Sequence, residues 1–123
     1  MRKIVSNTTP ILNLLKIGKL DLLHKLYNKI YIPQAVYREI ETGKDREYYI
    51  DLKNFNWIEI VQIQSVNARL YLFDLDDGEA ETIILAQELK ADAAIIDEQL
   101  GRRYAALVNG AVREVILGQP FLR

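Results

Sequence analysis

The sequence predicts an α/β sandwich whose sheet is mainly parallel, and three observations support this fold class. Strand-like and helix-like segments alternate along the chain, as they do in proteins built from parallel strands and crossover helices. Residues 76–89 have the start signals and the wide apolar face of a helix that packs against a large surface. Residues 93–96 read AAII, a short and continuously apolar run that is typical of an inner parallel strand covered on both faces.

The first half of the chain is predicted to contain two strands and three helices. Residues 3–6 form the first strand, and a polar turn at residues 7–10 places Pro10 in the first turn of the following helix, where proline is tolerated. The helix-like segments carry leucine, isoleucine or valine at helical spacing. The elements after the first strand are a helix ending at Gly18, a helix over residues 20–28, a strand over residues 30–32, and a helix that Pro33 opens.

The second half adds an edge strand and the central helix–strand pair. After a polar break at residues 42–45, residues 48–55 are predicted to form a short helix. Residues 57–63 alternate apolar and polar side chains, which indicates a strand at the edge of a sheet. The remaining elements are a helix or loop over residues 67–75, the helix over residues 76–89 capped by Asp76 or Asp77, the strand over residues 93–96, a helix over residues 100–107, and a strand or helical turn around Val112, Val115 and Ile116.

The composition limits the chemistry that the protein can perform. The 123 residues fit one domain, spanning residues 1–123, and 50% of them are hydrophobic, as in globular proteins. There is no cysteine and His24 is the only histidine, which excludes disulfides, cysteine nucleophiles and metal clusters built from thiolates or histidines. Any metal ion must therefore be bound by oxygen, which favours Mg²⁺, Mn²⁺ or Ca²⁺.

Charge and hydropathy bear on the surroundings and partners of the protein. The formal net charge is −1, so binding to nucleic acid requires a local basic patch or a partner subunit. No apolar run approaches the roughly 20 residues of a membrane span, and the first residues do not have the pattern of a signal peptide. We therefore expect a cytoplasmic protein with no membrane partner. A phosphate-handling nucleotide enzyme is disfavoured because the sequence has no glycine-rich phosphate loop.

Four polar side chains follow predicted strands or lie near the starts of predicted helices. Asn7 follows the first strand, Glu39 lies in the helix after the second, Glu79 begins the central helix, and Asp97 ends the inner strand. Parallel strands bring such positions to one edge of a sheet. Carboxylates without histidine or cysteine suit Mg²⁺ or Mn²⁺, which can activate water and neutralise a phosphodiester. The pattern therefore indicates a metal site for phosphodiester chemistry.

Four short motifs occur in order along the chain. They read IVSNTTP at residues 4–10 with LDLL at 20–23, IPQAVYREI at 32–40, GEAE at 78–81 with LA at 85–86, and IDE at 96–98 with GRR at 101–103. Together they resemble PIN domains, and in particular the small prokaryotic members that are similar to the VapC toxin ribonucleases of toxin–antitoxin pairs. Each motif alone is a weak signal, whereas the ordered set, which covers about residues 3–107, is specific.

The resemblance implies a three-layer α/β/α fold and an endoribonuclease that depends on Mg²⁺ or Mn²⁺. It also implies a homodimer or higher homo-oligomer and inhibition by a small antitoxin protein. Carried over by position, the acidic active-site residues of the family fall on Glu39, Glu79 and Asp97, and a hydroxyl position falls on Thr8. With Asn7, the three acids are the predicted catalytic and metal-binding residues.

The chain departs from the family pattern in two places. Asn7 stands where the family usually has aspartate, and an amide oxygen can coordinate a metal but contributes no charge, so metal affinity should fall. Residues 108–123 do not match the further strand and helix with which relatives usually continue, so we expect an altered or shortened C-terminal element.

The candidate residues also have purely structural interpretations. Residues 7–9 suit a strand-to-helix turn with local side-chain hydrogen bonds, and one residue can serve as both turn and ligand. Asp97 can cap the helix that follows it, and Glu79 can stabilise the positive end of its own helix. The assignment of Glu39 rests mainly on the resemblance, because an acid on an exposed helix face is usually a solvated charge.

Charged residues beside the motifs are weaker candidates. Glu98 either assists Asp97 or is an acid of a first helical turn, and Glu81 either supports the site or faces solvent. Arg102 and Arg103 can bind RNA phosphate, because arginine presents a fork of donors, or they are ordinary surface charge.

Two functions from different classes follow from these observations. The first is a metal-dependent ribonuclease, the toxin of a toxin–antitoxin pair. The second is a PIN-like protein with weakened or lost activity that works as a binding or dimerisation module. Asn7, the C-terminal segment and the negative net charge favour the second.

Overall fold

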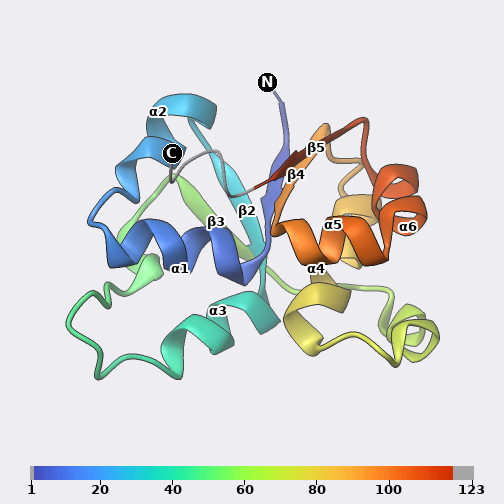
Figure 1. Cartoon of the computed structure of the whole chain (residues 1–123), viewed down its shortest axis with the longest axis horizontal. Coiled ribbons are helices and arrows are strands. Elements are labelled where there is room, and N and C mark those ends of the chain that lie inside the picture. Colours follow the sequence, from blue (N-terminus) through green and yellow to red (C-terminus); the bar gives the residue numbers. More distant parts are fainter. Residues whose placement is uncertain (1, 118–123) are drawn as a thin grey trace.

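A five-stranded parallel sheet forms the centre of the molecule (Figure 1). The structure is a computed structural model and describes residues 2–117. The strands lie in the order β3-β2-β1-β4-β5, and every pairing is parallel. Along the chain they are β1 (Ile4–Ser6), β2 (Ile30–Pro33), β3 (Ile58–Val61), β4 (Ala93–Ile96) and β5 (Glu114–Leu117).

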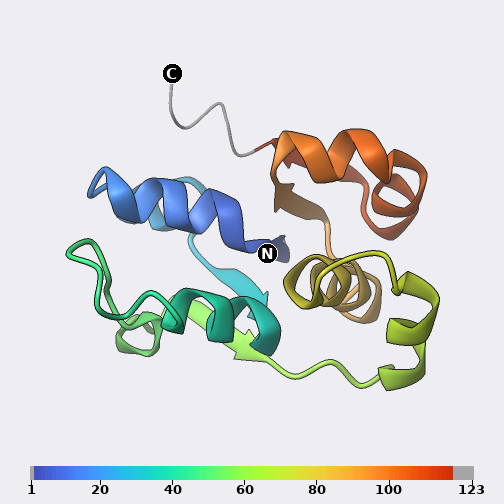
Figure 2. The ribbon, with the colours of Figure 1, turned by 60° about the horizontal axis from the view of Figure 1, so that its bottom comes forward.

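Helices cover both faces of the sheet, which confirms the predicted three-layer α/β/α sandwich (Figure 2). The first three helices pack on one face, and the last three pack on the other. They are α1 (Thr8–Lys16), α2 (Asp21–Tyr27) and α3 (Gln34–Glu41) on the first face, and α4 (Asp77–Glu88), α5 (Glu98–Arg103) and α6 (Ala105–Ala111) on the second. Two short 3₁₀ helices, η1 (Leu52–Asn54) and η2 (Val66–Leu72), lie in the connections.

The alternation of side chains along the central strands divides the core into two apolar clusters. Ile4, Ala93 and Ile95 point to the cluster beneath the first three helices. Val5, Ala94 and Ile96 point to the cluster beneath the last three. All four residues of β4 are buried, as expected for an inner parallel strand. The helices therefore hold both faces of β1 and β4 in fixed positions.

The order of the strands creates a switch point between β1 and β4. From β1, the chain adds β2 and β3 on one side of the sheet, and it then crosses to add β4 and β5 on the other side. In open parallel sheets, ligands bind beyond the carboxyl ends of the strands at such a switch point. The side chains that follow β1 and β4 are therefore the first to inspect for function.

Two predicted helices are wrong. Within residues 48–55, the only helical element is the 3₁₀ helix η1. Hydrogen bonds to α3 hold the rest of this segment in an irregular path, since the Tyr49 hydroxyl donates to Glu41 and the Tyr37 hydroxyl donates to Asp51. Residues 100–107 do not form one helix, since Tyr104 leaves the helical conformation (φ −126°, ψ 33°) and separates α5 from α6. The Tyr104 hydroxyl donates to Asp74 at 2.7 Å, which holds this break in place.

The segment after α6, for which the sequence allows a strand or a helical turn, forms a strand. Val115 and Ile116 lie in β5, which pairs with β4 and forms an edge of the sheet. The predicted change in the C-terminal element falls partly on residues 118–123, which lie outside the described residues. Within residues 2–117, no helix has the length and apolar character needed to cross a bilayer.

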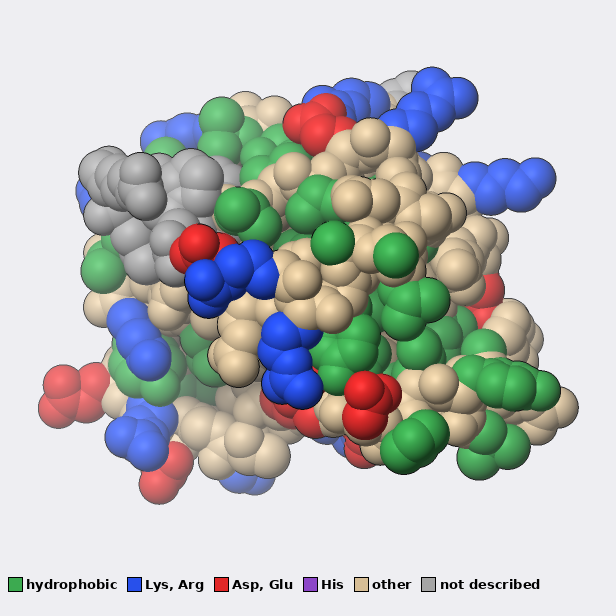
Figure 3. Space-filling view, turned by 45° about the vertical axis from the view of Figure 1, so that its right-hand side comes forward, with side chains coloured by type: hydrophobic (Ala, Val, Ile, Leu, Met, Phe, Trp, Pro, Cys, Tyr) green, Lys and Arg blue, Asp and Glu red, His purple; other side chains and the backbone are tan. Residues whose placement is uncertain are grey.

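The 3₁₀ helix η2 and the residue after it carry exposed large apolar side chains. Leu70 is 72% exposed, and Tyr71 and Phe73 are each 84% exposed. Figure 3 shows hydrophobic side chains gathered at its lower right, where η2 lies. Arg69 donates to the carbonyls of Leu72 and Leu75 within this segment, and it pairs with Asp77 at the start of α4 at 2.9 Å.

Candidate active site

Asn7 and Asp97 meet at the switch point of the sheet. Asn7 directly follows β1 and Asp97 directly follows β4, and the two strands are neighbours in parallel register. The Nδ2 group of Asn7 lies 3.5 Å from the Oδ2 atom of Asp97 and donates to it. The two motifs, 90 residues apart in the sequence, are thus brought into contact as predicted from their positions after strands.

Each of these two residues also caps a helix. Asn7 is only 2% exposed, and its Oδ1 atom accepts from the backbone N–H of Thr9 at the start of α1. The Oδ1 atom of Asp97 accepts from the backbone N–H of Leu100 at 2.7 Å at the start of α5. One oxygen of Asp97 is therefore fixed by the fold, and the other faces the site.

Glu79 lies in the first turn of α4 and forms a capping box with Asp76. The Asp76 carboxylate accepts from the Glu79 backbone N–H at 2.8 Å, and the Glu79 carboxylate accepts from the Asp76 backbone N–H at 3.2 Å. Partial burial raises the pKa of Glu79, and the negative charges of Asp76 and Asp97 raise it further. Asp97 thus acts electrostatically on Glu79, which places both acids in one region of negative potential.

Glu39 is held between three helices. Its Oε2 atom accepts from the Thr8 hydroxyl at 2.7 Å, and its Oε1 atom accepts from the Gly78 backbone N–H at 2.9 Å. The carboxylate therefore joins α3 to the first turns of α1 and α4, where helix dipoles favour a negative charge. Because both oxygens already accept hydrogen bonds from the protein, Glu39 is placed to position its neighbours.

Gly78 is required for this arrangement. A Cβ atom at residue 78 would lie 2.8 Å from Cδ of Glu39 and closer still to Oε1, so only glycine allows the carboxylate to reach the backbone. Gly78 belongs to the GEAE motif, but its sequence context alone predicts no role for it. The available signal was a glycine inside the first turn of a helix, where it has no conformational advantage and therefore suggests a close approach by another group.

The other predicted residues lie around this centre. Glu98 is half-buried in the first turn of α5, and Glu81 accepts from the Ala35 backbone N–H at 3.1 Å, which links α4 to the start of α3. Arg102 and Arg103 are exposed in the last turn of α5, and the Arg103 guanidinium lies 5.4 Å from the centre of the Tyr104 ring. Among the described residues neither arginine forms an ion pair with the acids of the site.

The donor atoms at this edge fit a hard divalent cation. Within residues 2–117, no three Asp, Glu, His or Cys side chains are close enough together to hold a metal ion among themselves. Mg²⁺ does not need such a set, since it commonly binds one or two carboxylates and completes its shell with water and substrate phosphate. Asp97 and Glu79 are carboxylates that could serve as that pair, and the negative charge of Asp97 adds to burial in raising the pKa of Glu79.

The fold and the site together define an α/β/α protein with an oxygen-only acidic site at the switch point of a parallel sheet. The sequence matches a family model described as PIN domain over residues 3–116, so the chain belongs to the PIN-domain family and has a nuclease fold. The match continues beyond residue 107 into β5 and includes every residue of the candidate site. No curated protein and no solved structure matched the chain.

Proposed function

We propose that the protein is a Mg²⁺- or Mn²⁺-dependent ribonuclease. The observation that carries this proposal is the contact between Asn7 and Asp97 at the switch point. The charge of Asp97 also contributes to raising the pKa of Glu79. An oxygen-only acidic site suits a hard cation. PIN domains in general depend on divalent metals, and this supports the same conclusion.

The roles of the side chains follow from their contacts. Asp97 and Glu79 are the proposed metal ligands, and the bound ion supplies water activation and neutralisation of the phosphodiester. Asn7 donates to Asp97 and so orients the carboxylate without adding charge to the site. Glu39 and Thr8 fix the start of α1 against the start of α4, and thereby set the spacing between Asn7 and Glu79.

We further propose a toxin of the VapC type that works in the cytoplasm, self-associates and is inhibited by a small antitoxin protein. The motif resemblance supports the toxin assignment, and the exposed apolar side chains of η2 support a protein partner, since such patches commonly mark interaction surfaces. Sedimentation of the purified protein tests self-association. A monomer at all accessible concentrations would contradict the oligomer.

The competing function is a PIN domain without nuclease activity that works as a binding module. A specific observation favours it: the position beside Asp97 holds a neutral amide that donates to the acid, so the site has one charge less than an aspartate would give it. The two functions differ in whether the protein cleaves RNA when it is saturated with metal.

The deciding experiment is cleavage of a long mixed-structure RNA by the full chain with Mn²⁺ or Mg²⁺, beside a sample with EDTA. The matched variants are Asp97→Asn, which keeps a good helix cap because asparagine caps as well as aspartate, and Glu59→Gln, which removes an exposed acid on the edge strand β3. We expect metal-dependent cleavage that falls by about 10²-fold or more in Asp97→Asn, because a ligand of the ion that activates water is lost, and that is unchanged in Glu59→Gln.

Absence of cleavage by the folded, metal-saturated protein would overturn the ribonuclease proposal and favour the binding module. Cleavage that persists in EDTA or in Asp97→Asn would point to a contaminating nuclease.

A further inference from the structure

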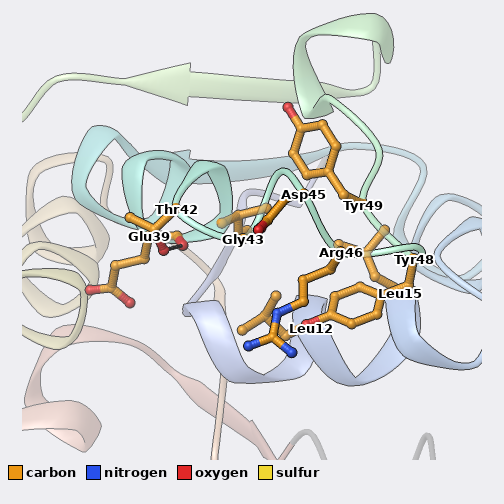
Figure 4. A pocket seen from close by; sticks show the side chains of 10 residues that line it. Leu12, Leu15, Glu39, Thr42, Gly43, Asp45, Arg46, Tyr48 and Tyr49 are labelled. Carbon is orange, nitrogen blue, oxygen red and sulfur yellow. Dashed lines mark hydrogen bonds between the residues drawn. The ribbon is translucent and has the colours of Figure 1, made fainter.

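A pocket lies directly beside the candidate site, between α1, α3 and the loop at residues 42–49 (Figure 4). Its volume is about 420 Å³, within the range of pockets that bind small organic molecules. Leu12 and Leu15 of α1 form an apolar wall, and Tyr48 lies against it. Tyr49 lines the pocket as well, so it is an accessible slot with aromatic side chains in its lining.

The pocket is continuous with the site because Glu39 lines one end of it. In Figure 4 the Glu39 carboxylate points away from the slot, and Arg46 and Tyr48 lie toward the other end. The carboxylate accepts hydrogen bonds from Thr8, which adjoins Asn7 in the sequence. It also accepts one from Gly78, which adjoins Glu79. A chain of nucleotides that passes the acids can thus extend past Glu39 into the slot.

The far end of the pocket carries the guanidinium of Arg46. Arg46 lines it and is exposed, and among the described residues it forms no ion pair, although Asp45 also lines the pocket. The ammonium group of Lys16 lies 5.9 Å from the centre of the Tyr48 ring. Five other cationic side chains are neutralised by acids: Arg2, Lys25, Lys29, Arg38 and Arg69.

These features fit one nucleotide of a single strand. An unpaired base needs an apolar wall and an aromatic face, which the α1 leucines and Tyr48 supply. A phosphate needs a planar fork of donors that is not already occupied, which Arg46 supplies. An acidic peptide would also meet Arg46, but it carries no flat base to fill the slot.

We propose that this pocket holds the nucleotide next to the scissile phosphate of single-stranded RNA, with Arg46 on a phosphate and Tyr48 against the base. The proposal rests on the proposed ribonuclease function and names the subsite that positions its substrate. Arg46 is then a positioning residue, which binds the strand beside the acids that carry the chemistry.

The test measures RNA binding without cleavage. The full chain carrying Asp97→Asn is titrated in EDTA against a fluorescent single-stranded RNA of about ten nucleotides, and the anisotropy is followed at several salt concentrations. Arg46→Gln is compared with Lys44→Gln, which removes a cation from the same loop outside the pocket. We expect a 5- to 10-fold weaker affinity for Arg46→Gln, and a salt slope reduced by about 0.7, the value for one phosphate of a single strand. Lys44→Gln should bind almost as the parent does.

Equal effects of the two variants, or none, would overturn the subsite, since Arg46 would then be ordinary surface charge. Inhibition of the anisotropy change by a single nucleoside monophosphate as strong as that by the RNA would also overturn it, because the pocket would then be a free-nucleotide site. This test can fail or succeed independently of the ribonuclease proposal. Arg46-dependent binding by a protein that never cleaves RNA would support the nucleotide subsite and contradict the ribonuclease activity.

Discussion

At the scale of single residues, the amide of Asn7 serves the fold and the site at once. Its Oδ1 atom caps α1, and its Nδ2 group faces Asp97 at 3.5 Å. An aspartate would keep the cap, because a carboxylate accepts the same hydrogen bond from Thr9. It would also place a second negative charge beside Asp97 in a buried position. Asparagine thus removes a repulsion that a bound cation, or uptake of a proton by one acid, would otherwise relieve.

Asn7→Asp should therefore destabilise the metal-free protein and strengthen metal binding. We expect the free energy of unfolding to fall by about 1–3 kcal/mol in EDTA, the usual loss when a buried polar group is left without its partner. Saturating Mn²⁺ should restore it. Urea unfolding with and without Mn²⁺ measures both effects. A metal-free variant as stable as the parent would show that residue 7 and Asp97 do not interact.

Gly78 gives a second test at this scale. Gly78→Ala should lower the free energy of unfolding by about 1–3 kcal/mol, because the new methyl group collides with the Glu39 carboxylate and must displace it. Gly110→Ala is the control, since a Cβ there meets no atom within 4 Å in α6. That variant should instead gain up to about 1 kcal/mol from helix propensity. Equal responses in chemical denaturation would mean that Glu39 does not dock on the α4 backbone.

Whether the contacts of these residues could be predicted from the sequence depends on where each residue lies relative to a strand. Asn7 and Asp97 directly follow strands, and parallel pairing brings the residues after neighbouring strands to the same edge of the sheet. Their contact could therefore be predicted. The contacts of Glu39 depend on how α3 packs against α4, and no local pattern encodes that packing. The role of Gly78 could not be predicted for the same reason, since it depends on the Glu39 carboxylate packing against the backbone of α4.

At the scale of elements, Glu88 connects the end of α4 to the segment that leads from β3 to η2. Its carboxylate accepts from the backbone N–H groups of Gln64 and Ser65. Partial burial raises the pKa of Glu88, but these hydrogen bonds and one from the Ser65 side chain outweigh it, so the pKa lies below its ordinary value of 4.5. A carboxyl of this kind contributes stability above its unfolded pKa and loses it as the pH falls through the folded pKa.

Glu88→Gln should consequently destabilise the protein near neutral pH and have little effect in acid. We expect a loss of about 1 kcal/mol at pH 7, typical of hydrogen bonds to a charged group at a partly exposed site. The difference from the parent should shrink below pH 4.5 and vanish once the parent carboxyl is protonated. Unfolding by urea across this pH range measures it, with Glu47→Gln as the control. A constant difference at all pH values would show that the charge of Glu88 is not involved.

Elements that follow from local pattern were predicted, and those that depend on distant partners were not. The strands at residues 30–32, 57–63 and 93–96 match β2, β3 and β4 because apolar runs and alternation are local signals. Residues 48–55 have helix-like composition, but hydrogen bonds to α3 hold them in an irregular path. The break at Tyr104 likewise depends on Asp74, thirty residues away.

At the scale of the whole molecule, the order of the strands decides where function lies. The sequence predicts a parallel sheet but does not say that the chain crosses from β3 to the far side of β1 before forming β4. That crossing makes β1 and β4 neighbours and brings together motifs from the two ends of the chain. It also places Glu79 beside them, because α4 is the connection that carries the crossing.

A cation bound at this edge should stabilise the entire domain, since it would join segments that separate on unfolding. At a Mn²⁺ concentration 100-fold above Kd, the gain is about 2.7 kcal/mol, which for a domain of this size corresponds to a rise in Tm of about 10 °C. Differential scanning calorimetry with Mn²⁺ against EDTA measures it. Asp97→Asn should show little rise, whereas Glu47→Gln should behave as the parent does. A rise of equal size in all three proteins would place the ion elsewhere and remove the physical basis for a metal-dependent reaction at the switch point.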